Sequence, residues 1–522
     1  MYEKLDRIIT IDGQLGTVKY VGQLPSDIWG SNVTALGVEW DQPERGKNNG
    51  TLEGISYFET EVEGAGSFIK ANNKKITKER YDFIEALIRQ YSGTTIDYQG
   101  TIMFGTKVAE SYGFEKLNEI QSDFNNLTSI SLEKKYICTS FHSSDRINRI
   151  FNSLDNVTNL DLSYNLFNNL NDIWDIIDPL EHLTELNLNG NRFFNNDEDI
   201  PKKPHNKLRS IKLASTNITI RQVIHQILPK FPSLQDITLA GNRYEDEVFN
   251  NISISHDSLL NMDLSYNRLR TIPHLKNKFN ILSSFNLANN CISDISEDMV
   301  FNYIHCIDLR NNEIDTWNTV DKLYLAFPDL RELRINGNPV FGSISVEEMT
   351  INLIARFEFS GERNSKIGYK INKLNGAFIS DDEITNAELY FISKVRNGDY
   401  NYDRKSKRWQ LLLNKYHIED IHQSREERND LSRKKIKLNI YSEFRQHIME
   451  RAFLTDNSIL RLKGVISRNL NRSILEFRVF YYINEAEDEI ENKIKQYLDD
   501  NIATIGNFGF SDNQKLYVTL NT

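Results

Sequence analysis

The sequence predicts a multidomain protein with a small all-β barrel at its start, an α/β solenoid of repeated units in its middle and a small α+β domain at its end. Three observations predict this fold class. The first eighty residues are dense in glycine and short β-type runs, the central part repeats one motif, and the last ninety residues alternate apolar and polar positions around one amphipathic stretch. A chain of 522 residues has room for three or four folding units at ~100–200 residues each.

The composition is that of a globular protein and excludes several classes. Apolar residues make up 39% and charged residues 26%, and no run of 18 apolar residues occurs, so no membrane partner is expected. The net charge of -11 disfavours nucleic acid as a partner. Three cysteines argue against a disulfide framework and a zinc ribbon, and the first residues lack the order of a signal peptide, so we expect a reducing, cytoplasmic environment.

Residues 1–80 are predicted to form the barrel. The runs 17–21 and 36–40 have the composition of strands, and glycines stand between such runs, where they permit tight turns and close backbone approach. A nucleotide-binding P-loop is excluded here, because the Gly-Lys pair at 46–47 is followed by Asn48 instead of Ser or Thr.

The motif L-x-x-L-x-L-x-x-N recurs along the middle of the chain. Its last positions are spaced by 22 to 26 residues, the period of leucine-rich repeats. These positions are Asn165, Asn191, Thr216, Asn242, Asn267, Asn290, Asn312 and Asn338. A weaker first copy lies at Leu127, Ile130 and Leu132. Each central apolar pair should face one core that is buried by stacking, and each Asn should hydrogen-bond turn backbone that would otherwise be buried unpaired.

One outward residue lies between the two core residues of each predicted strand. Curved solenoids generally bind proteins on this concave face, and a polar column of mixed charge suits that role. Plain solvation of the strand is the alternative for any single residue. The candidate protein-binding residues are Asp161, Lys212, Asp263, Asp308 and Arg334.

The chain beyond the repeats is predicted to end in a small α+β domain. Residues 436, 438 and 440 alternate with polar ones, a second strand is expected at 448–454, and Ser458 precedes the apolar spacing of a capped amphipathic helix. Two later runs alternate again, Leu475, Phe477, Val479 and Tyr481, then Leu516, Val518 and Leu520. This order resembles a ubiquitin-like β-grasp fold.

The N-terminal segment resembles a CAP-Gly domain in the runs Gly16–Gly22, Gly37–Asp41, Gly46–Gly50, Tyr57-Phe58 and Gly66–Ile69. That family binds the C-terminal tails of α-tubulin and of microtubule-tip proteins, which end in Glu-Glu-Tyr or Glu-Glu-Phe. Its loop is Gly-Lys-Asn-Asp-Gly, and Asn49 stands here in place of Asp. The resemblance implies a tail-binding site formed by Lys47, Asn48, Asn49, Gly50, Trp40, Phe58 and Phe68.

The residue types of the loop suit a carboxylate ligand. Lys47 supplies a positive charge, and the amides of Asn48 and Asn49 supply N–H donors. Glycines at 46 and 50 would let backbone N–H groups approach the carboxylate in a nest-like turn. The three aromatic residues either line a groove for the ligand or belong to the barrel core, and the sequence leaves both readings open.

The order of CAP-Gly domain, leucine-rich repeats and ubiquitin-like domain resembles the tubulin-folding cofactor E family across essentially the whole chain. The resemblance implies a non-enzymatic chaperone without cofactor or metal, cytoplasmic and cytoskeleton-associated. It would bind α-tubulin and act with β-tubulin and folding cofactors D and C in assembling or taking apart the heterodimer. The ubiquitin-like end would engage the proteasome or another partner surface.

Two alternatives stay open, a microtubule-tip adaptor and a proteasome-linked adaptor. A tip protein would normally carry a dimerising coiled coil, and no adequate heptad run is found. An enzyme is disfavoured because no H-E-x-x-H, paired C-x-x-C or G-x-S-x-G motif occurs. The predicted domains are CAP-Gly at 1–80, linker and solenoid N-cap at 81–120, leucine-rich repeats at 121–345, solenoid C-cap and helical linker at 346–430, and ubiquitin-like domain at 431–522.

Overall fold

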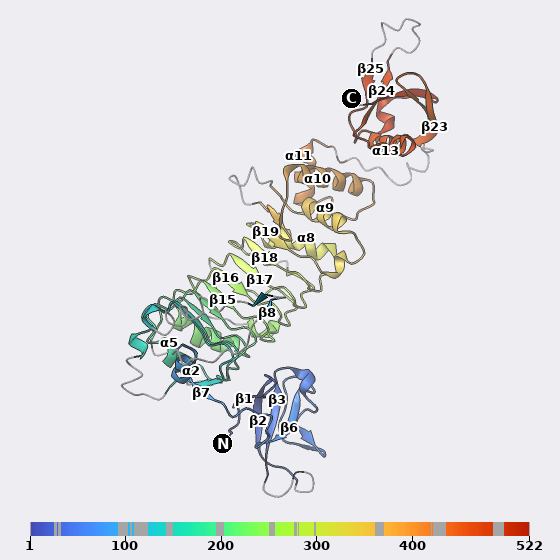
Figure 1. The fold of residues 1–522 in the computed structure, drawn as a ribbon. Coiled ribbons are helices and arrows are strands. Elements are labelled where there is room, and N and C mark those ends of the chain that lie inside the picture. The colour runs from blue at the N-terminus through green and yellow to red at the C-terminus, as the bar shows by residue number, and fades with distance from the viewer. Residues whose placement is uncertain are drawn as a thin grey trace. The chain divides into compact units, whose positions relative to one another are not determined.

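The computed structural model describes residues 2–25, 29, 33–91, 103–104, 107–108, 124–141, 150–194, 203–249, 256–275, 279, 281–296, 299–360, 370–418, 420, 435–483 and 495–520 (Figure 1). The chain divides into two compact units, Met1–Phe391 with Ser406–Arg408, and Ile392–Lys405 with Trp409–Thr522. Within the described residues, every helix is too short or too polar to span a membrane.

The first unit begins with a small all-β domain. Its antiparallel sheet has the order β1-β2-β3-β6, with β1 (Arg7–Ile9), β2 (Leu15–Gln23), β3 (Thr34–Trp40) and β6 (Gly66–Lys70). A short 3-10 turn, η1 (Pro43–Arg45), and a hairpin of β4 (Thr51–Leu52) and β5 (Ile55–Ser56) connect β3 to β6. The strands expected at 17–21 and 36–40 are confirmed within β2 and β3.

The repeats and two short strands that follow them form one sheet of eleven strands, parallel along most of its length. The strands are β10 (Ser129–Ser131), β12 (Asn159–Asp161), β13 (Glu185–Asn187), β14 (Ser210–Lys212), β15 (Asp236–Thr238), β16 (Asn261–Asp263), β17 (Ser284–Asn286), β18 (Cys306–Asp308), β19 (Glu332–Arg334), β20 (Lys373–Leu374) and β21 (Ala377–Phe378). The repeat prediction is confirmed, and so is the weaker first copy, because β10 pairs in parallel with β12.

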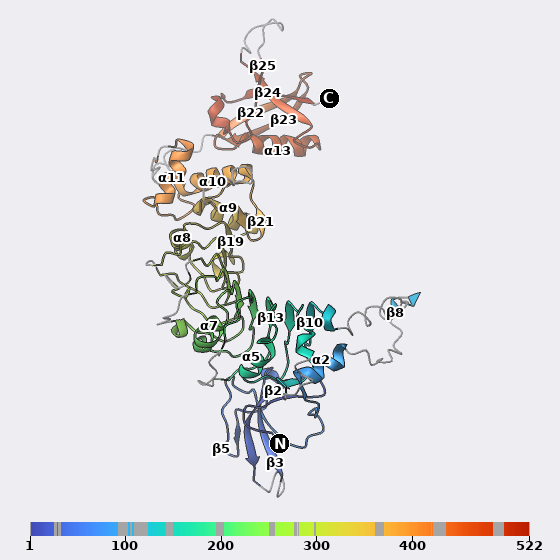
Figure 2. The same ribbon diagram turned by 90° about the vertical axis from the view of Figure 1, so that its left-hand side faces the viewer.

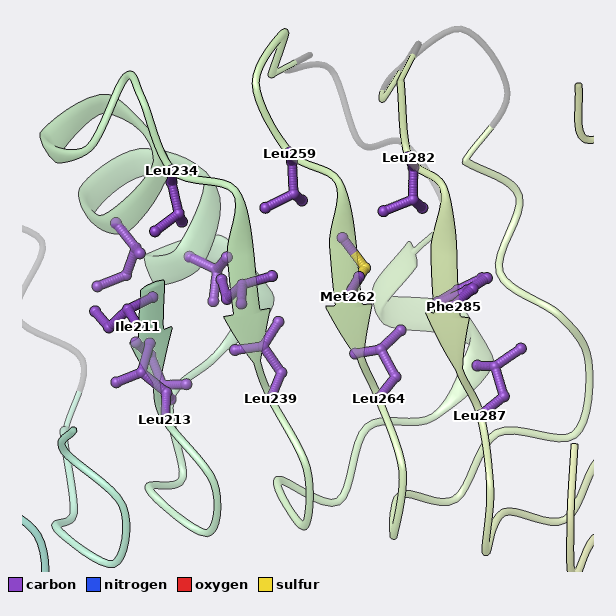
Figure 3. Packing of buried hydrophobic residues seen from close by; sticks show 14 of the residues in the cluster. Ile211, Leu213, Leu234, Leu239, Leu259, Met262, Leu264, Leu282, Phe285 and Leu287 are labelled. Carbon is purple, nitrogen blue, oxygen red and sulfur yellow. The ribbon is translucent and has the colours of Figure 1, made fainter. Parts of the chain in front are cut away.

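The central leucine pairs point away from the concave face into one continuous core (Figure 3). Met262 and Phe285 occupy the leucine position of β16 and β17 and are buried with the others. The connecting segments that close this core contain α5 (Asn171–Ile177), α6 (Ile220–Gln222), η3 (Val223–Ile227), α7 (Leu228–Lys230), η4 (Asp246–Phe249), α8 (Trp317–Ala326), η5 (Pro339–Phe341) and α9 (Val346–Arg356).

The N-terminal end of the solenoid core is covered by α2 (Phe83–Tyr91), which buries Phe83 and Leu87 there. Before it, β7 (Tyr81–Asp82) pairs with β11 (Ile137–Thr139), and η2 (Phe124–Asn126) precedes the first repeat strand. The short strands β8 (Met103–Phe104) and β9 (Lys107–Val108) pair with each other. Most of the predicted linker at 81–120 lies outside the described residues.

A ladder of buried asparagines joins neighbouring repeats. In each, Nδ2 donates both to a carbonyl of its own repeat and to one of the preceding repeat; Asn242, for example, reaches Leu239 O at 3.0 Å and Leu213 O at 2.9 Å. Thr216 has one hydroxyl donor, which lies 2.8 Å from Leu213 O and 3.3 Å from Asn242 Oδ1 and reaches no carbonyl of the preceding repeat among the described residues. The Asn side chains therefore satisfy buried carbonyls that the short strands leave unpaired.

The second unit contains a β-grasp domain, and the unit boundary falls within α10 (Asp381–Arg396), before α11 (Lys407–Tyr416). Its sheet order is β23-β22-β26-β24-β25, with β26 parallel to β22. The elements are β22 (Lys435–Ser442), β23 (His447–Leu454), α13 (Ile459–Leu470), β24 (Phe477–Tyr482), β25 (Lys495–Tyr497), η8 (Ile505–Phe508) and β26 (Gln514–Leu520). The capped helix is confirmed, because the Ser458 side chain accepts from the N–H of Arg461.

Two details of this domain differ from the prediction. Leu475 precedes β24 and is 81% exposed, so its place in the alternating pattern was wrong. The polar strand β25 was missed, because its three residues have no apolar alternation to reveal them.

Replacing Asn267 by alanine should destabilise the solenoid by about 2–4 kcal/mol. Its Nδ2 donates to Leu264 O at 2.8 Å and Leu239 O at 3.2 Å, and its Oδ1 accepts from the N–H groups of Asn242 and Tyr244, both at 3.0 Å. All of these buried groups would lose a partner. Urea unfolding followed by circular dichroism measures the change in the free energy of unfolding.

The matched control is Asn261→Ala in the same repeat. Asn261 is exposed on the concave face, where it donates to the Asp236 carboxylate. Its loss should change the free energy of unfolding by about 0.5 kcal/mol or less. Equal effects of the two substitutions would show that the ladder contributes no special stability.

Candidate functional site

The loop Gly46–Gly50 uses most of its backbone donors for its own structure. The N–H of Gly46 donates to Pro43 O at 2.9 Å, and those of Lys47 and Asn48 donate to Gly66 O at 2.7 and 3.0 Å. The N–H of Gly50 donates to the Asn48 side chain at 3.0 Å. The predicted nest of backbone donors at the two glycines is therefore wrong, because these groups are already paired within the domain.

The two glycines serve close packing instead. A Cβ on Gly46 would lie 1.9 Å from Gly64 O, and one on Gly50 would lie 2.0 Å from Phe58 O. Gly50 also has φ +89°, a region that residues with a side chain rarely adopt. The glycines thus press the loop onto the backbone of residues 58 and 64–66 and leave its side chains as the groups available to a ligand.

Three side chains of the loop keep donors for a ligand. Lys47 is exposed and forms no ion pair with any described residue. Asn48 is half-buried and Asn49 exposed; their Oδ1 atoms accept from the N–H groups of Gly50 and Gly64. Their Nδ2 groups have no hydrogen-bond partner in the described part of the chain. An ammonium and two amide donors without a described partner therefore stand on three successive residues of the loop.

An aromatic cluster adjoins the loop through Phe58, which packs against Gly50. Phe68 lies edge-on to Phe58 and to Tyr57, with ring centroids 5.3 and 5.6 Å apart, and Tyr57 lies 5.3 Å from Tyr20. Phe58 is buried, whereas the other three rings are half-buried. The structure therefore gives the loop an aromatic neighbour with partly exposed rings.

Tyr20 and Tyr57 were not singled out as site residues from the sequence. Gly37 in the middle of β3 indicated that other groups approach this strand closely. A Cβ on Gly37 would lie 2.3 Å from the Phe58 ring and 2.9 Å from Tyr20 Cβ. A glycine inside a strand marks such a close approach.

Trp40 is not brought to this cluster. It is 4% exposed in the core of the β domain with Val18, Leu36 and Val38, and the Arg45 guanidinium lies 4.4 Å from its ring centroid. Of the two readings that the sequence left open, the structure places Trp40 in the core.

The outward side chains of the repeat strands form a column, called the outward column here. They differ in whether a neighbouring group of the chain already binds them. The Oδ1 atoms of Asp161, Asp263 and Asp308 each accept the N–H two residues further on, at 2.8 to 3.1 Å. Arg334 donates to the Glu332 carboxylate at 2.7 Å. Lys212 differs from these four, because it is exposed and pairs with no described side chain.

On the concave face around β18 and β19, the Glu332 carboxylate lies within ion-pair distance of Arg334 and Lys373. Cys306 lies opposite Glu332 in the strand register. The pKa of the Cys306 thiol is raised to about 11, mainly because the thiol is buried and secondly because the Glu332 carboxylate is close to it. Among the described residues, no group of three or more His, Cys, Asp or Glu side chains is arranged to hold a metal ion.

Comparison with known proteins agrees with this architecture. The CAP-Gly domain family matches residues 5–74. "Protein PAC2" of Saccharomyces cerevisiae is 29% identical over 514 residues, covering 96% of this chain and 95% of that protein. "Tubulin-specific chaperone E" of Xenopus laevis is 30% identical over 353 residues, covering 64% and 63%. The protein of the same name from Mus musculus is 25% identical over 537 residues, covering 94% and 95%.

A solved structure of the C-terminal ubiquitin-like domain of mouse tubulin-specific chaperone e covers 17% of this chain and 91% of that one, with 17% identity and a TM-score of 0.15. Fold and sequence together define a CAP-Gly protein with a leucine-rich-repeat solenoid and a ubiquitin-like domain. The resemblance of the chain to the tubulin-folding cofactor E family is confirmed, and it extends over nearly the full length of several relatives.

Gly50→Ala should loosen the β domain strongly, by more than about 2 kcal/mol, because φ strain adds to a backbone clash. Gly54→Ala is the matched control. Gly54 has φ +79° but open space around a Cβ, so only the strain of about 1 kcal/mol should remain. Hydrogen exchange of the β2 and β3 amides measures both. Similar exchange rates in the two variants would contradict the packing role of Gly50.

Alkylation of Cys306 by iodoacetamide at pH 8 should be roughly two orders of magnitude slower than that of a free thiol, because the thiolate reacts and a pKa of about 11 keeps it scarce. Glu332→Gln removes a negative charge, so it should lower the pKa and speed the reaction severalfold. Peptide mass spectrometry measures the rate. An unchanged rate in this variant would exclude Glu332 as a cause of the shift.

Proposed function

We propose that the protein is a tubulin-folding chaperone that binds α-tubulin at two places. The CAP-Gly domain binds the acidic C-terminal tail, and the solenoid binds the folded body. One observation carries the proposal: the Lys47 ammonium and the amide donors of Asn48 and Asn49, which have no partner among the described residues, lie on a loop that adjoins a partly exposed aromatic cluster, in a domain matched by the CAP-Gly family. Relatives named Tubulin-specific chaperone E, matched over nearly their full length, support it.

The chemistry of the loop fits an acidic tail that ends in an aromatic residue. Carboxylates of the tail would pair with the Lys47 ammonium and accept from the two amides, in charge-assisted hydrogen bonds. The terminal ring would pack edge-on against Tyr57 and Phe68, as these rings do with each other. Because the loop's backbone donors are used internally, affinity for the tail depends on these side chains.

On the solenoid, Lys212 is the candidate anchor for the body of the client. It is an exposed cation of the outward column, whereas Asp161 and Asp263, two strands away on either side, cap their own turns. Two weak contacts on one chain strengthen each other through effective concentration, so neither has to be tight.

The wider role proposed is non-enzymatic and cytoplasmic. The chain would hold α-tubulin during assembly or disassembly of the heterodimer, with β-tubulin and folding cofactors D and C as partners. No cofactor or metal takes part in this proposal.

A second candidate is a proteasome-linked adaptor acting through the ubiquitin-like domain. It is favoured by Phe444, which lies between β22 and β23 and is 93% exposed, an unusual position for an aromatic side chain. Pull-down with the whole chain separates the candidates: a chaperone retains soluble α-tubulin, whereas an adaptor retains proteasome without tubulin.

Lys47→Ala combined with Asn48→Ala should weaken binding of a peptide ending in Glu-Glu-Tyr by at least about tenfold, because the cation and one amide donor are lost. Fluorescence anisotropy with a labelled peptide measures the dissociation constant. Raised salt should weaken binding to the unmodified chain and have less effect on the variant.

Lys74→Ala is the control. It removes the same charge from an exposed lysine of the β domain outside the loop, so peptide affinity should stay within about twofold. If the loop variant bound the peptide as tightly as the unmodified chain, tail binding at this loop would be excluded.

A further inference from the structure

The N-terminal β domain meets the edge of the solenoid through charged and polar groups. Glu61, exposed between β5 and β6, receives two donors from the repeats: Arg243 Nη1 at 2.7 Å and Asn217 Nδ2 at 3.1 Å. A second carboxylate, that of Asp41 after β3, lies 3.6 Å from Arg192 Nε. Figure 2 shows this domain beside the first repeats.

The solenoid residues of this contact share one position in the repeat. Arg192, Asn217 and Arg243 each directly follow the ladder residue of their repeat, so they line up along one edge of the solenoid. Asn217 and Arg243 have φ +58° and +62°, a left-handed conformation that asparagine tolerates best and that arginine rarely adopts. The ladder therefore sets the spacing of the donors that face the β domain.

On the β-domain side of the contact, neighbouring groups of the same domain hold the Glu61 carboxylate in place. Lys19 Nζ lies 3.1 Å from Glu39 and 3.4 Å from Glu61, and Glu39 Oε1 accepts the N–H of Glu61 at 2.8 Å. Lys19 is the extra residue of a bulge in β2, which turns its side chain toward these acids and brings it 5.9 Å from the Phe194 ring centroid.

Asp41 is fixed from within the β domain as well. The buried Arg7 side chain donates to both of its oxygens. Burial would raise the pKa of Asp41, but the charges of Arg7 and then of Arg192 hold it below its ordinary value. The acid therefore stays ionised opposite Arg192 across the physiological pH range.

Among the described residues, the β domain and the solenoid do not share a hydrophobic core. The core of the β domain, formed by Ile8, Val18, Leu36, Val38, Trp40 and Ile76, is separate from the core of the solenoid. The polar contacts are therefore the specific link between the described surfaces, and such links weaken when salt screens them.

We propose that the Glu61–Arg243–Asn217 and Asp41–Arg192 contacts form a latch that docks the CAP-Gly domain on the solenoid edge. Arg243, Asn217 and Arg192 are then positioning residues, which fix the direction of the Lys47 loop relative to the concave face. The latch itself does not depend on the proposed function, because it needs no ligand.

The test is a distance measurement in the full chain without tubulin. Spin labels are attached through a noncanonical amino acid at Ser56 in β5 and Leu325 in α8, both exposed, with the three native cysteines left in place. Pulsed electron spin resonance then reports one narrow distance when the domain is docked. Glu61→Arg and Arg243→Glu should each lower the docked-to-undocked ratio about tenfold, because like charges then face each other.

The combined variant Glu61→Arg with Arg243→Glu restores opposite charges and should return the narrow distribution. Glu63→Arg is the matched control, since Glu63 is exposed two residues away and has no described partner on the solenoid; it should leave the distance unchanged. Raising NaCl from about 0.05 to 1 M should broaden the unmodified distribution, as the screening length shortens.

Either of two results would overturn the latch. In the first, the single variants give the same distance distribution as the unmodified chain. In the second, the charge-swap variant gives a distance distribution as broad as that of the worse single variant. Unfolding midpoints measured in parallel distinguish undocking from unfolding. Binding of the Glu-Glu-Tyr peptide should be the same in all latch variants, so a failure of the peptide experiment and a failure of the latch are told apart.

Discussion

The fold depends on one interaction, the buried hydrogen bonds from a ladder asparagine to the carbonyls of two neighbouring repeats. The strands β10 and β12 to β19 have only three residues each, too few to satisfy the backbone of the turn that follows. One planar amide with two donors fills this need, and the hydroxyl of Thr216, with one donor, fills half of it. Because the ladder fixes the repeat register, it also fixes the spacing of two rows of side chains: the outward column with Lys212, and the edge with Arg243.

In the β domain, the corresponding constraint is close backbone approach at glycine. Gly50 and Gly37 both make room for the Phe58 ring and backbone, so they connect the loop to the aromatic cluster. The same packing removes the loop's backbone donors from ligand chemistry. The glycine-rich pattern predicted free backbone donors at this loop, and the structure shows these donors paired, because spacing in a sequence does not reveal which N–H groups are already paired.

Regular repetition made most of the fold predictable from the sequence. The leucine and asparagine spacing predicted β10 and β12 to β19, but not β20 and β21, which lie beyond the last copy of the motif; Ser458 with its apolar spacing predicted α13. Contacts between residues far apart in the sequence were beyond prediction: Tyr20 with Tyr57 within the β domain, and Glu61 with Arg243 between two folds. No local pattern encodes such pairs. For Asp263, the sequence predicted the outward position of the side chain but not its role as a turn cap.

The two proposals meet in the geometry of a bivalent binder. A flexible tether lets both sites engage one client at a modest effective concentration, whereas a docked domain raises that concentration only if its fixed direction suits the client. Docking therefore gives selectivity by shape: a tail reaches the Lys47 loop when its body lies correctly on the solenoid. The latch and the tail contact both use carboxylates against cations, so salt weakens them together. Binding of a whole client should then fall more steeply with salt than binding of an isolated tail, and the difference between the two slopes measures how much the docked geometry contributes.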